Sequence, residues 1–157
     1  MNEGRSRPLQ TLCMLLIFAL FAASALLLVL AAAGAFRGVS AQVESSGRIR
    51  TSLAYVANKV RAGDESGAVA LEDEGNVRAL VISSQAGGEV CKTYLYWHGG
   101  YLKELFLAAD QPFAPEDGEQ IERLSGFSVR KAGRLLTVTA AGPEGETLSA
   151  AVCLRSS

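Results

Sequence analysis

The sequence predicts an α+β protein in which a long N-terminal transmembrane helix continues into an amphipathic helix that packs on an antiparallel β-sheet. Three observations support this fold class: an uncharged apolar run, an apolar stripe at helical spacing after it, and short extended segments separated by turns beyond Gly67. The chain accordingly divides into a short tail (1–8), a transmembrane segment (9–36), an amphipathic helix extension (37–63) and an antiparallel β domain (64–157).

The transmembrane segment reads LQTLCMLLIFALFAASALLLVLAAAGAF. Its uncharged core, from Leu12 to Ala33, reaches the roughly 20 residues that a helix needs to cross a bilayer. It is also longer than the 7–15 or so residues of a typical secretory signal. Small residues at 33–35 and 39–41 resemble signal-peptidase sites, so a cleaved signal is the alternative. We expect a retained single-pass anchor.

Basic residues flank the apolar run on both sides and leave its orientation nearly balanced by the positive-inside rule. They are Arg5 and Arg7 before it, and Arg37, Arg48 and Arg50 after it. The short tail and the export-like sequence favour a cytoplasmic N-terminus. We therefore expect a protein of the cell membrane whose C-terminal domain is extracytoplasmic.

Beyond the membrane segment, apolar residues recur in steps of three and four, which is typical of one face of a helix. They are Val39, Val43, Ile49, Leu53, Val56 and Val60, with Ser46 filling the gap. This stripe needs a cover, and the β domain supplies one. We expect Leu53, Val56 and Val60 to bind the helix to the sheet.

The extent of the helix is predicted from its stop signal, Gly63-Asp64. The simplest interpretation is one helix from about residue 9 to 62. Because glycine weakens a helix, the alternative is two helices with a break between Gly34 and Gly38.

The β domain is predicted from short extended runs with turn signals between them. The runs are GAVALE, VRALVISS, EVCKTYLYW, YLKELFLA, GFSVRKA, GRLLTVTA and ETLSAAVCLR. In the last run, apolar and polar residues alternate, as in an antiparallel strand with one buried face. Residues 110–120 form the one long irregular segment and are predicted to be a loop.

The composition argues against an enzyme and against a nucleic-acid-binding protein. The chain contains one histidine and one tryptophan, and 15 basic residues face 16 acidic ones for a net charge of −1. Nucleic-acid binding needs a clustered basic face. We expect a non-enzymatic protein with no cofactor and no nucleic-acid partner.

The chain contains three cysteines. Cys91 and Cys153 fall in the predicted extracytoplasmic domain, where a disulfide is chemically possible, but two small buried thiols are favoured. Cys13 lies in the membrane segment as an apolar filler. Cys91 with His98 as nucleophile and base lacks an orienting third group and is disfavoured.

Two side-chain clusters have a structural and a functional interpretation. The acidic residues of the predicted loop offer oxygen ligands to calcium, but the ligand spacing of a known calcium loop is absent, so a solvated loop is favoured. These weak metal candidates are Asp110, Glu116, Asp117 and Glu119. Aromatic residues flank one predicted turn, where core packing is favoured over a partner-binding patch. They are Tyr94, Tyr96, Trp97, Tyr101 and Phe106.

A hydrophobic N-terminal helix that extends beyond the membrane and packs on an antiparallel sheet resembles the plan of type IV pilins and pseudopilins. The resemblance covers the whole chain and implies lateral bundling of helices in a filament. The prepilin motif is missing, because Gly4 is followed by Arg5, the fifth residue after Gly4 is Leu9, and no acidic residue follows before Glu44. Processing by a prepilin peptidase is therefore not implied.

The stretches TSLAYVANKVRAGD, GGYLKELFLA and PFAPEDGEQI resemble a family of uncharacterised single-pass proteins of Gram-positive bacteria that contain a domain of unknown function. This resemblance implies an accessory component of a filament, competence or secretion system. It carries no active site over to this sequence.

The function expected from these observations is structural: a membrane-anchored, pilin-like or pseudopilin-like component of a type IV filament, competence or type II-like secretion system. Its expected partners are the membrane and other pilin-like subunits or assembly proteins. Small residues in the anchor would let helices approach closely; they are Ala19, Ala22, Ala23, Ala25 and Ala31 to Gly34. The alternative is a solitary membrane-anchored extracytoplasmic binding or sensor domain that does not polymerise.

Overall fold

A computed structural model describes residues 6–65 and 67–155, except for the side chains of residues 6–8 and 36–42. The chain forms two compact units, Met1–Gln42 and Val43–Ser157. The second is called the C-terminal unit below. Arg5 lies outside the described residues, and so do the side chains of Arg7, Arg37 and Val39.

The helical part of the chain is a single helix, α1, from Ser6 to Ala62. The backbone is helical between Gly34 and Gly38, where the alternative interpretation placed a break. Lys59 and Arg61 occupy the last turn, where positive charge is favourable at the helix terminus. The helix ends directly before Gly63, whose N–H donates a 3.0 Å hydrogen bond to the carbonyl oxygen of Lys59.

In the described part of the chain, eight strands follow α1, and they form two antiparallel sheets rather than the single sheet that the sequence predicts. The five-stranded sheet has the order β1-β2-β3-β4-β5 and the three-stranded sheet the order β6-β7-β8. The strands are β1 Val69–Glu74, β2 Val77–Ala86, β3 Glu89–His98, β4 Tyr101–Ala108, β5 Glu119–Arg123, β6 Gly126–Ala132, β7 Leu135–Ala141 and β8 Thr147–Cys153. Both sheets are simple meanders, so every pairing is between strands adjacent in the sequence.

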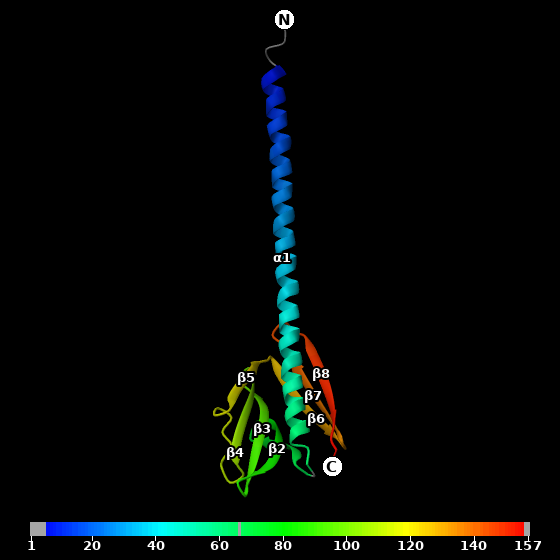
Figure 1. The fold of residues 1–157 in the computed structure, drawn as a ribbon. Helices are drawn as coiled ribbons and strands as arrows, with labels where there is room; N and C mark the ends of the chain where they lie inside the picture. The colour runs from blue at the N-terminus through cyan, green and yellow to red at the C-terminus, as the bar shows by residue number, and fades with distance from the viewer. Residues whose placement is uncertain (1–5, 66, 156–157) are drawn as a thin grey trace. The chain divides into compact units, whose positions relative to one another are not determined.

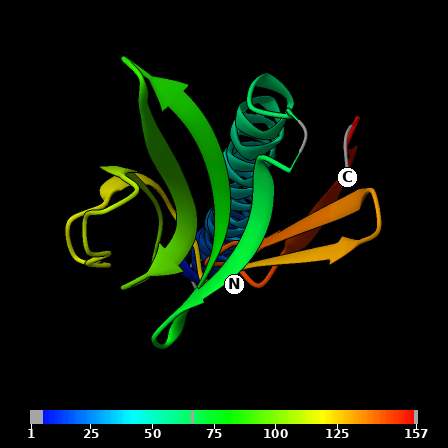
Figure 2. The same ribbon diagram turned by 90° about the horizontal axis from the view of Figure 1, so that it is seen from below.

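Within the C-terminal unit, the end of α1 lies between the two sheets (Figures 1 and 2). One hydrophobic cluster joins the helix to both sheets, with Leu80 and Leu95 from the five-stranded sheet and Leu136 and Val152 from the other. Splitting the strands into two sheets lets each cover a different side of one helix. The fold class, an α+β protein with a long apolar N-terminal helix and antiparallel sheets, is confirmed.

The strand β5 is not among the extended runs that the sequence pattern predicts. It contains Glu119, Gln120, Ile121, Glu122 and Arg123, and it pairs with β4 through an irregular register between Leu102 and Lys103. Charged residues are depleted in strands, but they are tolerated at a sheet edge, where they also discourage unwanted pairing. A short polar edge strand therefore gives no hydrophobic alternation in the sequence.

Candidate functional site

The first candidate site is the apolar segment of α1, Leu9–Ala35. It has a mean hydropathy of 2.9, and none of its most apolar stretch is buried by the rest of the protein. The segment is long and apolar enough to cross a membrane, a test that an N-terminal signal sequence also passes. The large side chains are exposed in all directions, with Phe18 at 70% and Leu28 at 75% of their full exposure. Such a surface requires a lipid or protein environment.

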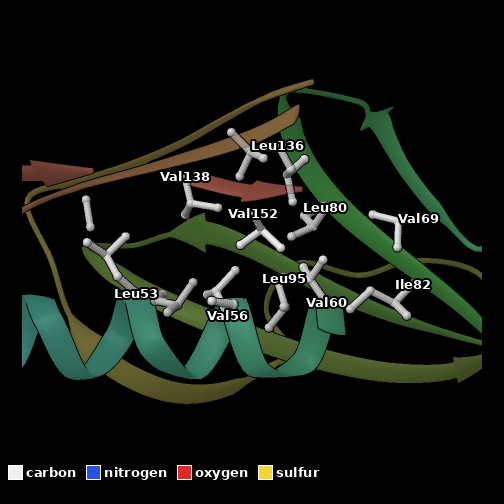
Figure 3. Packing of buried hydrophobic residues seen from close by; sticks show 14 of the residues in the cluster. Leu53, Val56, Val60, Val69, Leu80, Ile82, Leu95, Leu136, Val138 and Val152 are labelled. Atoms are coloured by element: carbon white, nitrogen blue, oxygen red, sulfur yellow. The ribbon is translucent and has the colours of Figure 1, made fainter. Parts of the chain in front are cut away.

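The second candidate site is the helix–sheet contact in the C-terminal unit. Leu53, Val56 and Val60 are buried, and they belong to one cluster with residues of both sheets (Figure 3). Ile49, one turn earlier, is buried in the same cluster. The steps of three and four place these four side chains on one face of α1, as the sequence pattern indicated.

The N-terminal part of the predicted stripe differs from expectation. Val43 is 68% exposed, and Ser46 is half-buried. The buried position is instead Ser45, whose Oγ has no hydrogen-bond partner within the described residues. The buried face of α1 begins at about Ser45. Val43 precedes this point, and its side chain is therefore not covered by the sheets of this unit.

A polar network joins α1 to β4 beside this core. Glu104 accepts hydrogen bonds from the Tyr55 hydroxyl and, at 2.6 Å, from Nζ of Lys59. The hydrogen bond to Glu104 raises the pKa of Lys59, and burial together with the Glu104 carboxylate raises the pKa of Tyr55. Both shifts favour the protonated forms that donate to Glu104. The network fixes the rotation of the helix against the sheet.

The outer face of the five-stranded sheet carries a second, smaller core. Tyr94 and Tyr96 are buried there, and Phe113 from the loop after β4 contacts both rings at centroid distances of 5.0 Å. Desolvation raises the pKa of both tyrosines. The predicted irregular loop is therefore folded onto the sheet and buries its apolar surface.

Two residues hold this loop in place. Nζ of Lys103, a buried lysine, donates hydrogen bonds to the carbonyl oxygens of Pro115 at 3.1 Å and Glu116 at 2.9 Å. The Tyr96 hydroxyl donates to the same Pro115 oxygen at 3.0 Å. A Cβ at Gly118 would lie 2.2 Å from the Tyr96 hydroxyl oxygen, so only glycine fits there.

A cleft of about 520 Å³ opens at one end of the five-stranded sheet. It lies where the β1–β2 turn, the β3–β4 turn and the loop after β4 meet. Its lining combines aromatic or apolar side chains with polar ones: Trp97, Phe113 and Pro115, with Glu74, Asn76 and His98. Nε2 of His98 lies 3.6 Å from Oε1 of Glu116. Such a mixture of aromatic surface and hydrogen-bonding groups is typical of a small-ligand site.

The cysteine candidates lie apart in the fold. Cys91 is buried in β3 of the five-stranded sheet, and Cys153 is exposed in β8 of the three-stranded sheet. Both thiols are free, so the structure contains no disulfide between them. The interpretation of both as buried thiols is wrong for Cys153, because that position falls on the outer face of β8. Cys13 is exposed on the apolar segment.

A nucleophile–base pair of Cys91 and His98 is excluded by the strand geometry. The two residues lie near opposite ends of β3, seven positions apart, which corresponds to about 23 Å. An odd separation also places their side chains on opposite faces of the sheet. The thiol and the imidazole therefore do not meet.

The acidic candidates do not converge on a metal site. Asp110, Glu116, Asp117 and Glu119 are all exposed. Among the residues that the structure describes, no three metal-ligating side chains lie close enough to hold an ion. The side chains of these acidic residues instead give the loop and the start of β5 a negative surface.

The aromatic residues near the β3–β4 turn divide between the two faces of the sheet. Tyr94 and Tyr96 pack in the core, as favoured, but Trp97 is 39% and Phe106 57% exposed. The Trp97 indole N–H donates a 3.0 Å hydrogen bond to the carbonyl oxygen of Leu124. The alternation in the sequence distinguishes the two faces of the five-stranded sheet, but it does not indicate that the loop after β4 covers one of them.

Comparison with known proteins identifies a family but no function. A family described as a domain of unknown function, DUF4860, matches residues 48–142. No curated protein and no solved structure matches the chain. The matched range contains the buried end of α1, the whole five-stranded sheet and β6 and β7. The resemblance to an uncharacterised family with a domain of unknown function is thereby confirmed, and because the match spans more than half of the chain, the protein belongs to the DUF4860 family.

Proposed function

We propose that the protein is a non-enzymatic, single-pass membrane subunit with a pilin-like plan, which works by lateral association of its apolar helices. The segment Leu9–Ala35 would lie in the cell membrane with the N-terminus in the cytoplasm. The C-terminal unit would be extracytoplasmic and would present its surface to other subunits or to assembly proteins of a filament, competence or type II-like secretion system.

One observation carries this proposal: the same helix, α1, contributes both a membrane-length apolar segment and the central buried stripe of the C-terminal unit. A simple anchor needs only the first property, because a flexible linker would serve to tether a domain. In a helix-bundling subunit, the helix is also the element on which the folded domain is built.

Fractionation and oxidative cross-linking test the proposal in cells. We expect full-length protein, beginning near Met1, in the membrane fraction. The exposed thiol of Cys13 then reports helix association, because a disulfide forms only where two anchors bring their Cys13 Cα atoms within about 7 Å. In a Cys153→Ser background, mild oxidation should give a dimer that Cys13→Ser abolishes.

Two results would reject this function. Soluble protein beginning near Phe36 would identify the apolar segment as a cleaved signal. Membrane-bound protein with no Cys13-dependent dimer would indicate an anchor that stays monomeric.

The second candidate function, a solitary ligand-binding or sensor domain, is favoured by the cleft of about 520 Å³. Trp97 lines this cleft and is the single tryptophan of the chain, so its fluorescence reports the cleft directly. A saturable change in Trp97 emission with a small-molecule panel, lost in Asn76→Ala but retained in Asn58→Ala, would support this function. Unchanged emission throughout the panel would count against it.

A further inference from the structure

Each sheet of the C-terminal unit ends in two edge strands, and no strand pairs with their outer edges within the described residues; β5 is one edge strand of the first sheet and β8 is one edge strand of the second. The other two edge strands approach each other, because Nζ of Lys131 on β6 donates a 2.8 Å hydrogen bond to the carbonyl oxygen of Val69 on β1. Figures 1 and 2 place β5 and β8 on opposite sides of this unit, with the end of α1 between them. Unpaired strand edges are templates for pairing with another chain.

The free edge of β8 borders a groove of about 390 Å³ between this strand and α1. The helix side of the groove consists of Leu53 and a stripe at steps of four, three and four: Arg50, Ala54, Ala57 and Arg61. The two alanines give the middle of the groove a flat apolar floor, because they carry no bulk beyond Cβ. Leu148 and Ala150 of β8 form the opposite wall.

The two arginines mark the ends of this groove. Both are exposed, and neither forms an ion pair with any residue that the structure describes. Nη1 of Arg61 makes only a 3.3 Å hydrogen bond to Asn58. The arginines are eleven positions apart along α1, which corresponds to about 16 Å. The groove therefore suits an extended segment of about that length with negative charge.

The other free edge, β5, has the length and the negative charge that fit this groove. Its five residues, Glu119–Arg123, span about 16 Å as a strand. Neither Glu119 nor Glu122 forms an ion pair within the described part of the chain. The exposed Glu116 and Asp117 precede the strand, so acidic residues outnumber the single Arg123.

We propose that β5 of one copy of this protein adds to the free edge of β8 in a second copy and lies in the groove beside α1. Backbone hydrogen bonds along β8 supply affinity, and the carboxylates of Glu119 and Glu122, about 10 Å apart along the strand, lie between the side chains of Arg50 and Arg61 of the second copy. This inference deepens the proposed function, on which it rests, by naming the partner and the surface.

The contact is heterologous, because it uses different surfaces of the two copies. Each bound copy then still offers one free β5 edge and one free β8 groove. Repetition of a heterologous contact gives an open chain unless the rotation happens to close a ring. The arrangement therefore produces a linear assembly from a single type of subunit.

Cysteine cross-linking of the full chain in membranes tests this contact. One copy carries Gln120→Cys and a second, differently tagged copy carries Ser149→Cys, both in a Cys13→Ser, Cys153→Ser background. We expect oxidation to give a mixed dimer at least tenfold more abundant than the Gln120→Cys dimer with itself. Arg50→Glu with Arg61→Glu in the second copy should remove it, and Glu119→Arg with Glu122→Arg in the first copy should restore it.

The controls separate this contact from helix association. All four charged positions lie on the surface or at its edge, and unchanged Trp97 emission will show that the variants fold. If the mixed dimer is absent, or insensitive to charge reversal, while Cys13-dependent dimers form in the separate Cys153→Ser protein, the β5–β8 contact is wrong and lateral helix association stands. If both dimers are absent, both proposals fail. Cross-linking of the Ser149→Cys copy to an unrelated protein would also overturn the self-association.

Discussion

Lys59 on α1 and Glu104 on β4 are joined by a 2.6 Å hydrogen bond between Nζ and Oε1. The side chain of Glu104 is 15% exposed and that of Lys59 40%, so one partner is shielded and the other remains in contact with water. Tyr55 donates to the second oxygen of the same carboxylate. These hydrogen bonds align the helix with the five-stranded sheet, because they depend on direction in a way that apolar packing does not.

The alignment predicts a specific loss of stability in alkaline solution. The pKa values of Lys59 and Tyr55 are raised in the folded protein from ordinary values of 10.5 and 10.0. A group with a raised folded pKa contributes stability that is complete below its unfolded pKa and is lost as the pH rises toward the folded value. We expect the free energy of unfolding to fall above about pH 10.

The Glu104→Gln variant should be less stable by about 1 kcal/mol at pH 8, a small value because Lys59 is partly solvated. Its stability should also fall less steeply above pH 10, because the main cause of the raised Lys59 pKa is gone, although burial still raises the pKa of Tyr55. Denaturant titration followed by Trp97 fluorescence measures both effects. Asp73→Asn, which removes an exposed pair with Arg78, is the matched control and should leave the alkaline slope unchanged. Identical slopes for Glu104→Gln and the parent would contradict this account.

The buried stripe predicts a large difference between two positions on the same helix. Leu53→Asp places an unpaired charge among Val56, Val138 and Val152 and should cost several kcal/mol. Val43→Asp changes an exposed valine and should cost less than about 0.5 kcal/mol. Leu53→Ala should fall between them at about 2–5 kcal/mol. Chemical unfolding of the three variants in one detergent provides the comparison, and equal costs for Leu53→Asp and Val43→Asp would show that the stripe is not buried.

The positions on the apolar face of α1 show which features of the fold could be predicted from the sequence. The steps of three and four predicted Leu53, Val56 and Val60 correctly because a helical period depends only on local order. The same pattern was wrong at Val43, because burial there depends on where the sheets end. The division into two sheets and the short strand β5 depend on contacts between distant segments, which no local pattern records. The loop contact between Phe113 and Tyr96 was missed for the same reason.

Ser45 provides a test in which a substitution should stabilise the protein. The residue is 1% exposed, and its buried hydroxyl has no partner among the described residues, so folding leaves a dehydrated polar group. Ser45→Ala removes that group and replaces serine by a better helix former, and we expect a gain of about 1 kcal/mol. Ser52→Ala is the matched control, because its buried hydroxyl already donates a 3.1 Å hydrogen bond to the carbonyl oxygen of Arg48. If thermal unfolding shows a loss for Ser45→Ala, the hydroxyl has a partner.

The cysteines differ in predicted reactivity. Cys153 is exposed and Cys91 buried, both with free thiols. Because access limits thiol alkylation, a polar maleimide should label Cys153 rapidly in the folded protein and Cys91 only after denaturation. Mass spectrometry of non-reduced protein should find both as thiols. A mass lower by two hydrogens, with Cys91 linked to Cys153, would require the two sheets to be rearranged.

The loop over the outer face depends on one glycine. Gly118 leaves the space occupied by the Tyr96 hydroxyl, and a Cβ there would also lie 3.2 Å from Cβ of Lys103. Gly118→Ala must displace either the loop or the tyrosine, which breaks the hydrogen bond to Pro115 and separates Phe113 from Tyr96. We expect a cost of about 1–3 kcal/mol, typical of overpacking, and faster amide hydrogen exchange at residues 113–118.

Gly47→Ala, on α1 with open space around it, should instead stabilise by up to about 1 kcal/mol. Because β5 begins directly after Gly118, the same variant should also weaken the mixed cross-link between Gln120→Cys and Ser149→Cys. An unchanged exchange rate in the loop would show that Tyr96 and Lys103 do not hold it against the sheet.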